Sequence, residues 1–213
     1  MAEDDILKRL RRFRTQYFPR FRKAFHQLVE KGQRPTVLFI GCSDSRVVPY
    51  LLMDSGPGEL FIVRNVGNLV PPHDASLGFH GTGAAIEFGV LRLGVRHIVV
   101  CGHSHCGAIR ALYDDASGDT PHMNHWLDLA RGAVLPVTVS EDALRRTEQR
   151  SVVLQLERLM AYPMVAQRVE QGSLFLHGWH YSIEDGRVST LDIESGSFVQ
   201  AELPPQSTID TLQ

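Results

Sequence analysis

The sequence predicts an α/β fold: a mainly parallel central sheet flanked by helices, with an N-terminal helical arm. Short apolar runs at 36–41, 60–64 and 97–101 are typical of buried strands, and segments with helical periodicity lie between them. This alternation is typical of βαβ units, which place their strands in parallel. Because 213 residues suffice for one full core, we expect a single domain over 1–213.

The arm is expected over residues 1–32. Apolar side chains recur every three or four residues from Ile6 to Val29, which gives a helix one apolar stripe. Pro19 is expected to break or kink this helix. The opposite face is basic and carries Lys8, Arg9, Arg11, Arg12, Arg14, Arg20, Arg22 and Lys23. We interpret it as a solvated face over a packed stripe that suits contact with a second subunit; the alternative is a helix on a membrane surface.

The elements after the arm follow in order along the chain. A strand at 36–41, a short helix near 47–53, a strand at 60–64, a helix at about 80–93, a strand at 97–101 and a helix from about 105 to 113 form the alternating part. Helices at 121–132 and 141–160 and a terminal hairpin of 173–181 with 187–193 complete the chain.

Composition excludes several classes of function. The formal net charge of -2 argues against nucleic acid, which binds to clearly basic surfaces. The first thirty residues lack the apolar core of a signal peptide, and no stretch approaches the roughly 20 apolar residues that span a bilayer. Three cysteines form no disulfide framework and are typical of a reducing compartment. We therefore expect a cytoplasmic protein without a membrane or nucleic-acid partner.

Candidate metal ligands follow two of the predicted strands. Cys42 comes directly after the run at 36–41, and His103 and Cys106 follow the run at 97–101. Open α/β sheets place their sites at the carboxyl ends of strands, where these side chains are expected to meet. Zinc prefers thiolate and imidazole ligands in a tetrahedral array, and catalytic zinc sites leave one position to water. The sequence therefore predicts a zinc site.

Spacing alone leaves the third ligand open. His103 and His105 share a face if the strand continues, whereas a helix that begins near His105 favours Cys106. Each residue taken alone also suits ordinary packing. Cys101 lies inside the apolar run and is expected to be a core residue.

Asp44 and Arg46 lie two and four residues after Cys42. The planar guanidinium of arginine holds a carboxylate bidentately, which would keep Asp44 ionised and direct one oxygen at a metal-bound water. Such an acceptor matters because two thiolates cancel the charge of Zn²⁺ and make bound water harder to deprotonate. Asp44 and Ser45 also suit capping of the following helix.

The sequence resembles the β-class carbonic anhydrases. Residues 42–46 match the family pattern C-x-D-x-R, and residues 103–106 match H-x-x-C. Segments 57–61, 64–68, 81–87 and 177–179 are also similar, so the resemblance is close over 33–115 and looser elsewhere. It implies one Zn²⁺ per subunit on Cys42, His103 and Cys106. It also implies reversible hydration of CO₂ to bicarbonate and a proton by attack of zinc-bound hydroxide.

The resemblance also implies roles for other residues. Asp44, held by Arg46, would accept a hydrogen bond from the hydroxide. Gln33 stands where a glutamine orients the substrate. The residues implied to line an apolar pocket are Phe61, Val66 and Phe88, and family members often have tyrosine at the last of these positions.

The family includes a closed form in which the aspartate binds zinc and a bicarbonate ion lies near a tryptophan, an arginine and a tyrosine. Arg64 and Tyr181 would fill two of these places, but Phe39 stands where tryptophan is expected. Gln33 and Phe39 therefore favour the open form. His73, His80 and His180 are candidates for a proton shuttle, and nothing in the sequence ranks them.

Two other functions suit the same residues. Zinc-bound hydroxide would also hydrolyse a heteroallene such as CS₂ or COS, and a structural zinc protein would close the site with His105 or Asp44 as a fourth ligand. The resemblance implies a homodimer or a dimer of dimers, with the substrate pocket near the subunit boundary and the arm reaching across it.

Overall fold

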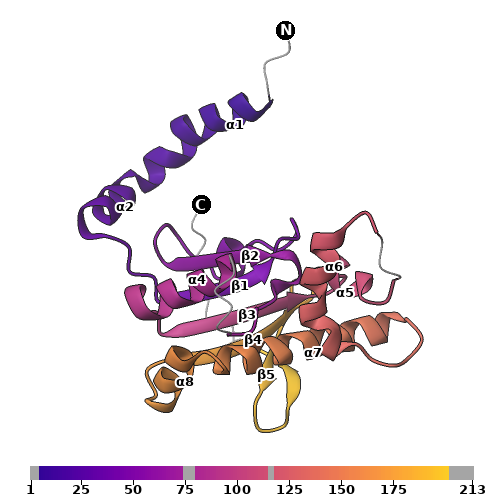
Figure 1. Ribbon diagram of the computed structural model, residues 1–213. Helices are drawn as coiled ribbons and strands as arrows, with labels where there is room; N and C mark the ends of the chain where they lie inside the picture. Colours follow the sequence, from indigo (N-terminus) through magenta and orange to yellow (C-terminus); the bar gives the residue numbers. More distant parts are fainter. Residues whose placement is uncertain (1–4, 74–79, 115–117, 202–213) are drawn as a thin grey trace.

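A six-stranded sheet with the order β2-β1-β3-β4-β5-β6 forms the centre of the protein (Figure 1). The computed structural model describes residues 5–73, 80–114 and 118–201. The strands are β1 (Val37–Cys42), β2 (Leu60–Asn65), β3 (His97–His103), β4 (Phe175–Tyr181), β5 (Val188–Asp192) and β6 (Ser197–Gln200). The first four are parallel, and β5 and β6 are antiparallel. The predicted α/β class is confirmed, but β6 follows the hairpin, which is therefore not terminal.

The helices also follow the predicted order. They are α3 (Pro49–Leu52), α4 (Gly81–Glu87) with the π-helical η3 (Phe88–Leu93), α5 (Gly107–Ala111), α6 (Pro121–Leu127) with the 3-10 segment η4 (Asp128–Ala133), α7 (Glu141–Met160) and α8 (Pro163–Glu170). A short 3-10 segment, η2 (Val66–Asn68), follows β2. The sequence reading missed α8 because Pro163 suggests a helix end, whereas here it begins a new helix.

Alternate side chains of the central strands enter two different clusters. Leu38 and Ile40 of β1 join Val100 of β3 in the main core, which also includes residues of α4, η3, α7 and α8. Phe39 points to the other face, where it packs with Val99, Cys101 and the ring of Trp179. The prediction that Cys101 is a core residue is confirmed, since its side chain is fully buried.

Two glycines allow α7 to lie very close to the sheet. A Cβ atom at Gly102 of β3 would lie 2.7 Å from Val152 Cγ2, and one at Gly178 of β4 would lie 3.0 Å from Leu156 Cδ1. Val152 and Leu156 are both residues of α7. The helix therefore packs almost directly on the backbone of β3 and β4.

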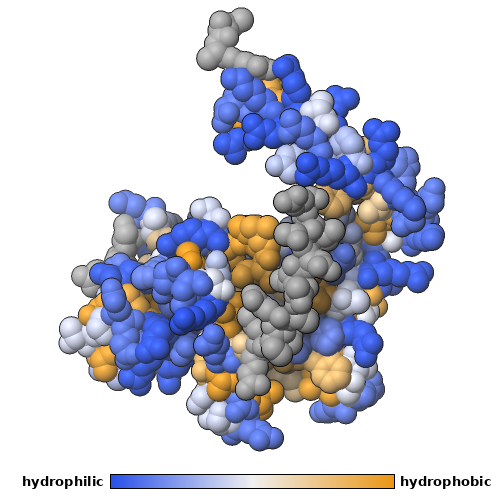
Figure 2. Space-filling model, turned by 180° about the vertical axis from the view of Figure 1, so that it is seen from behind, coloured by the Kyte–Doolittle hydropathy of each residue, from blue (hydrophilic) through white to orange (hydrophobic). Residues whose placement is uncertain are grey.

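The N-terminal arm is helical from Asp5 to Lys31 and stands away from the body (Figures 1 and 2). It comprises α1 (Asp5–Arg12), the π-helical η1 (Phe13–Tyr17) and α2 (Phe18–Lys31). Of the expected break or kink at Pro19, the break does not occur, because the helical path continues through the proline, but a π-helical turn directly precedes it. A widened π-helical turn just before a proline moves away the carbonyl with which its ring would clash.

The structure has no membrane-spanning helix among the residues it describes, because none of its helices is both long and apolar enough.

Gly102→Ala is expected to lower the free energy of unfolding by about 1–3 kcal/mol, because the new methyl group overpacks the contact with Val152. Urea unfolding of the purified protein measures this change. Gly81→Ala is the matched control, since a Cβ atom there meets nothing within 4 Å. Equal stability of the two variants would contradict the close approach of α7.

Candidate metal centre

Cys42, His103 and Cys106 come together at the carboxyl ends of two neighbouring strands. Cys42 is the last residue of β1, His103 is the last residue of β3, and Cys106 directly precedes α5. One ligand atom from each lies within 4.8 Å of the others, and all three residues are buried. The donor set of two thiols and one imidazole suits zinc.

The imidazole of His103 is oriented for a metal ion. Its Nδ1 lies 2.9 Å from the carbonyl oxygen of Ser104, which places the proton on Nδ1. Its Nε2 is buried and has no hydrogen-bond partner among the residues that the structure describes. A buried nitrogen lone pair that faces two sulfur atoms fits a cation, and a backbone carbonyl on the other ring nitrogen is a usual support for a metal-binding histidine.

The pKa values of the two neighbouring thiols shift in opposite directions, so one of them ionises readily, which also fits cation binding. The hydrogen bond with Cys106 lowers the pKa of Cys42 from 9.0 to about 4, aided by the neighbouring imidazole of His103 and by backbone hydrogen bonds at Asp44 and Gly67, and against the opposing effect of burial. The hydrogen bond to Cys42, together with burial, raises the pKa of Cys106 well above 9.0. A metal ion bound to both sulfur atoms would displace the remaining proton.

Gly67 gives the sulfur of Cys42 a fixed hydrogen-bond donor. Its backbone N–H points at Cys42 Sγ over 3.4 Å. The residue has φ of +81°, a conformation that only glycine adopts readily. The conformation therefore turns this amide toward the metal centre.

His105 is not part of the cluster. It has φ of +56°, its side chain is 60% exposed, and Nε2 lies 3.8 Å from a carboxylate oxygen of Glu184. The helix α5 begins at Gly107, two residues later than expected, and the intervening turn directs His105 outward and Cys106 inward. The alternative between His105 and Cys106 is therefore decided in favour of Cys106.

Asp44 and Arg46 form a bidentate ion pair beside the cluster. Arg46 Nε donates to Asp44 Oδ1 over 2.9 Å, and Nη2 donates to Oδ2 over 2.7 Å. Nη2 also donates to the carbonyl oxygen of His105, which fixes the guanidinium group. This pairing holds the pKa of Asp44 well below its usual range, so the carboxylate stays ionised at neutral pH.

Arg64 supports the same loop from β2. Its guanidinium group donates to the carbonyl oxygen of Cys42 over 3.0 and 2.9 Å, and to that of Asp44 over 2.6 Å. Phe39 lies fully buried against Trp179. Arg64 and Phe39 stand at two of the three positions that the resemblance assigns to the bicarbonate site of the closed form. Both side chains already make contacts within the chain.

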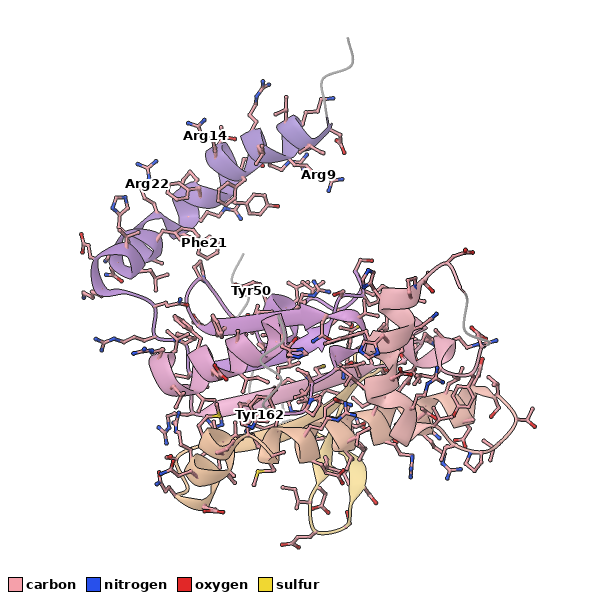
Figure 3. The ribbon with its side chains drawn as sticks, in the orientation of Figure 1. Arg9, Arg14, Phe21, Arg22, Tyr50 and Tyr162 are labelled. Carbon is pink, nitrogen blue, oxygen red and sulfur yellow. The ribbon has the colours of Figure 1, made fainter. Side chains whose placement is uncertain are left out.

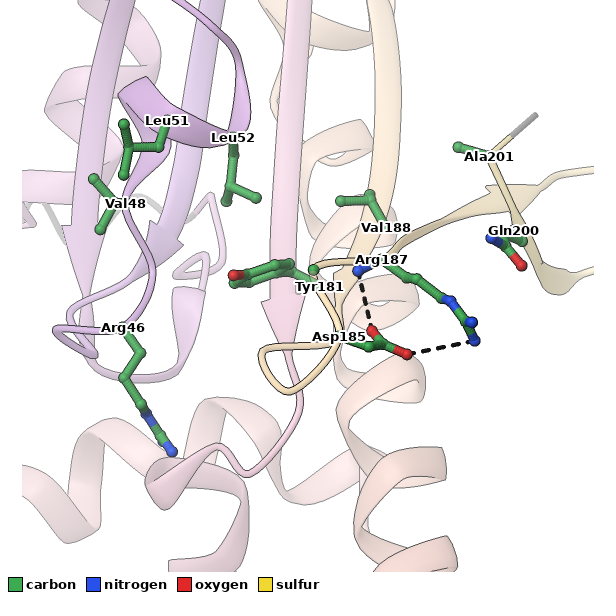
Figure 4. A pocket seen from close by; sticks show the side chains of 11 residues that line it. Arg46, Val48, Leu51, Leu52, Tyr181, Asp185, Arg187, Val188, Gln200 and Ala201 are labelled. Atoms are coloured by element: carbon green, nitrogen blue, oxygen red, sulfur yellow. Dashed lines mark hydrogen bonds and ion pairs between the residues drawn. The ribbon is translucent and has the colours of Figure 1, made fainter. Parts of the chain in front are cut away.

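A cavity of about 540 Å³ is lined in part by Arg46 (Figure 4). Its other lining residues include Leu52, Tyr181 and the ion pair of Asp185 with Arg187. The three ligand residues do not line it. This cavity is thus beside the metal centre and separate from it.

Only one of the expected pocket residues lies next to the metal residues of its own chain. Val66 precedes Gly67, is partly exposed, and accepts a hydrogen bond from Trp126 Nε1 at its carbonyl oxygen. In the register of β1 and β2, Phe61 pairs with Leu38 and Asn65 pairs with Cys42. Phe61 therefore lies four residues, or about 13 Å along the strand, from the level of Cys42.

Phe88 and Gln33 lie toward that same distant end. The ring centroids of Phe88 and Phe61 are 5.8 Å apart, and Phe88 is 45% exposed. Gln33 is an exposed residue of the segment before β1. The structure therefore does not bring Gln33, Phe61 and Phe88 to the metal residues of the same chain.

Two supporting residues were missed by the sequence reading. The segment 103–106, which carries His103 and Cys106, is called the metal loop below. Ser104 donates from Oγ to Glu184 Oε2 over 2.6 Å and thereby connects the metal loop to the β4–β5 turn. Glu148 of α7 accepts a hydrogen bond from the backbone of Cys106 and contacts His180. His180 is 5% exposed, so it lacks the solvent contact that a proton shuttle needs. No local signal in the sequence sets Glu148 apart from the other glutamates of this helix.

Comparison with known proteins agrees with this geometry. Residues 37–188 match the carbonic anhydrase family. A carbonic anhydrase of Synechococcus elongatus is 43% identical over 191 residues, which cover 86% of this chain and 69% of that protein. One of Pseudomonas aeruginosa is 42% identical, over 95% of this chain and 93% of that protein.

The chain belongs to the β-class carbonic anhydrase family. The structure of the β-carbonic anhydrase CcaA has a TM-score of 0.86 at 39% identity, and covers 93% of this chain and 91% of that chain. A β-carbonic anhydrase of Sordaria macrospora, described as tetrameric, has a TM-score of 0.77 at 28% identity, over 91% and 96% of the two chains.

As a β-class carbonic anhydrase, the protein is an enzyme that hydrates CO₂ reversibly to bicarbonate. Zinc is its cofactor, and the Cys42, His103 and Cys106 triad is typical of the zinc site of this class. Family membership favours CO₂ over CS₂ or COS as the substrate. A purely structural zinc site would need a fourth protein ligand, and the cluster found in the described residues has three.

Cys42→Ser and Cys106→Ser are each expected to lose zinc and CO₂ hydration together, because a hydroxyl group is a far weaker zinc ligand than a thiolate. Metal analysis of the purified variants, alongside stopped-flow hydration assays, measures both losses. Cys101→Ala is the control, since this third buried cysteine lies outside the cluster and should keep one zinc per chain. Full zinc content in either serine variant would contradict the ligand set.

Proposed function

We propose that Asp44 and Arg46 are the catalytic pair of this carbonic anhydrase. The observation that carries the proposal is the bidentate pair of the two side chains directly beside the Cys42, His103 and Cys106 cluster. When bound, zinc supplies the Lewis acidity that makes a water molecule nucleophilic at neutral pH. The protein has to orient that nucleophile and keep a hydrogen-bond acceptor in place for it.

Asp44 suits the acceptor role because it stays ionised. Arg46 lowers the pKa of the carboxyl group, and an ionised carboxylate accepts hydrogen bonds without donating any. Its side chain is only 17% exposed, so bulk water competes little for its free lone pairs. Arg46 acts on the nucleophile through Asp44 by fixing where the two oxygens point.

We further propose that the site works in its open form. Both oxygens of Asp44 are bound by Arg46, and the potential ligand cluster does not include Asp44. Arg64 donates to two carbonyl oxygens of the Cys42 loop and Phe39 is fully buried, so neither is free to receive a bicarbonate ion. The coordination position left by three protein ligands is then available to water.

The substrate pocket is proposed to form between two copies of the chain. Val66 would contribute from the copy that holds the metal, while Gln33, Phe61 and Phe88 would contribute to the pocket of the second copy. Their exposure and their distance from the metal residues of their own chain support this division. An uncharged, linear substrate suits a pocket lined by such apolar side chains.

The arm would hold the two copies together. None of its residues from Asp5 to Lys31 is buried, and exposed apolar side chains follow one of its sides. Phe21 points to the side that faces the body, and Arg14 and Arg22 point from the opposite side (Figure 3). Hydrophobic residues also gather on the body below the arm (Figure 2). These features support a homodimer or a dimer of dimers built from one domain of 1–213 with its arm at 1–32.

Asp44→Asn is expected to keep zinc but to lose most CO₂ hydration, because an amide cannot replace the ionised acceptor. Zinc content and stopped-flow turnover of the variant measure the two properties separately. Asp185→Asn is a matched control, since Asp185 pairs with Arg187 at the same spacing but is not part of the ligand cluster. Turnover of Asp44→Asn close to that of Asp185→Asn would refute the proposed role.

The double variant Phe13→Ser, Phe21→Ser is expected to shift the protein toward smaller species, because it removes apolar contact area from the arm. Sedimentation velocity over a range of concentrations measures this shift. Arg14→Ser with Arg22→Ser changes the opposite side of the arm and should leave the assembly intact. An unchanged sedimentation coefficient in the phenylalanine variant would contradict assembly through the arm.

A further inference from the structure

The turn that carries Cys106 needs support from outside itself. Between His103 and Cys106 the backbone passes through His105 at φ of +56°, a left-handed conformation that is costly for a residue with a Cβ atom. The helix α5 begins only at Gly107, so the backbone N–H of Cys106 takes no part in helical hydrogen bonding. Cys106 is 3% exposed, and its N–H therefore requires a partner inside the protein.

Glu148 supplies that partner from the neighbouring helix α7. Its Oε1 accepts a hydrogen bond from the N–H of Cys106 over 3.1 Å. Its other oxygen, Oε2, lies 2.9 Å from Nε2 of His180 on β4. Glu148 and His180 are 3% and 5% exposed, so both ends of the carboxylate are held inside the protein.

The surrounding packing is built around this contact. His180 pairs with Gly102 in the register of β3 and β4, one residue before His103. The absence of a side chain at Gly102 lets α7 approach, and the backbone oxygen of Glu148 would lie 3.6 Å from a Cβ atom there. Glu148 therefore reaches the metal loop because the glycine brings its helix against the strand that carries His103.

Burying the carboxylate of Glu148 has a free-energy cost that an apolar side chain would not have. Taking such a group out of water costs free energy unless hydrogen bonds and a partner compensate for it. An apolar side chain would pack against Val152 and its neighbours without that cost. The hydrogen bond to the backbone N–H of the metal ligand Cys106 accounts for a carboxylate at position 148.

We propose that Glu148, held by His180, is a positioning residue for Cys106. Its hydrogen bond fixes the peptide unit at the start of Cys106, and this fixes the direction in which the sulfur atom points. The proposal rests on the metal centre described above, and it concerns how the protein orients a ligand before the metal binds. Loss of comparable supports around metal ligands typically weakens metal binding by about 10- to 100-fold.

Two conservative variants separate the reach of the side chain from its charge. Glu148→Gln keeps the length and an oxygen acceptor for Cys106, and its amide donates to His180. Glu148→Asp keeps the charge but withdraws the carboxylate from the N–H of Cys106. We expect Glu148→Asp to weaken zinc binding about 10- to 100-fold, and Glu148→Gln to bind nearly as tightly as the unsubstituted protein.

Zinc affinity is measured by competition with a chelator, without reference to activity. The Co²⁺-substituted proteins give a second readout, because the thiolate-to-cobalt charge-transfer bands report how well both sulfur atoms bind. These bands should weaken in Glu148→Asp and persist in Glu148→Gln. Thermal unfolding of the metal-free proteins shows separately what each substitution does to stability. Glu157→Asp is the control, since Glu157 lies exposed on the same helix.

The outcomes are distinct. Zinc affinity and cobalt bands in Glu148→Asp equal to those of the Glu157→Asp control would overturn the positioning role, even if stability fell. Weakened zinc binding in Glu148→Gln with unchanged binding in Glu148→Asp would also overturn it, since the charge of the side chain would then matter and its reach would not. Failure of the unsubstituted protein to bind zinc would instead refute the metal centre itself.

Discussion

The parallel register of β1 with β3 is the constraint on which the rest of the structure depends. Ile40 pairs with Val100 and Gly41 pairs with Cys101, so Cys42 and His103 end their strands side by side. A slip of one residue would turn the alternating side chains of β1 to the wrong face and separate the ligands. Because Leu38 and Ile40 are fully buried on one face and Phe39 is fully buried on the other, the core itself excludes that slip.

Each metal-binding residue is held by a different part of the fold. The amide of Gly67 points at the sulfur of Cys42, the carbonyl of Ser104 orients His103, and Glu148 holds the backbone of Cys106. These contacts come from the segment after β2, from the metal loop itself and from α7. The contacts that form when the domain folds therefore also orient the three ligands, so that these side chains need to move little when the metal binds.

The sequence was sufficient for features that depend on local pattern. Strand ends followed by Cys42 and by His103 predicted the zinc site, and the helix predicted at 141–160 has the observed bounds of α7. Features set by distant contacts were beyond its reach. Glu148 meets Cys106 across 42 positions and His180 across 32, and no local pattern encodes either contact. The sequence favoured Cys106 over His105, but the left-handed conformation of His105, which turns its side chain away from the cluster, was not foreseen.

Charge compensation explains why Asp44 can lie so near a cation and still keep the acceptor role proposed for it. Two thiolates already neutralise Zn²⁺, so the metal attracts a third anion less than it would in a site of neutral imidazoles. Arg46 meanwhile satisfies both oxygens of Asp44 with directed, charge-assisted hydrogen bonds. To become a metal ligand, Asp44 would have to leave Arg46, and the attraction of the neutralised metal centre would replace that ion pair only weakly.

The contact of Arg46 with the carbonyl oxygen of His105 also favours the ion pair over metal ligation by Asp44. The guanidinium group cannot follow the carboxylate toward the metal without breaking this further hydrogen bond. The metal loop thus fixes Arg46, Arg46 fixes Asp44, and the same turn that directs Cys106 to the metal keeps the carboxylate away from it.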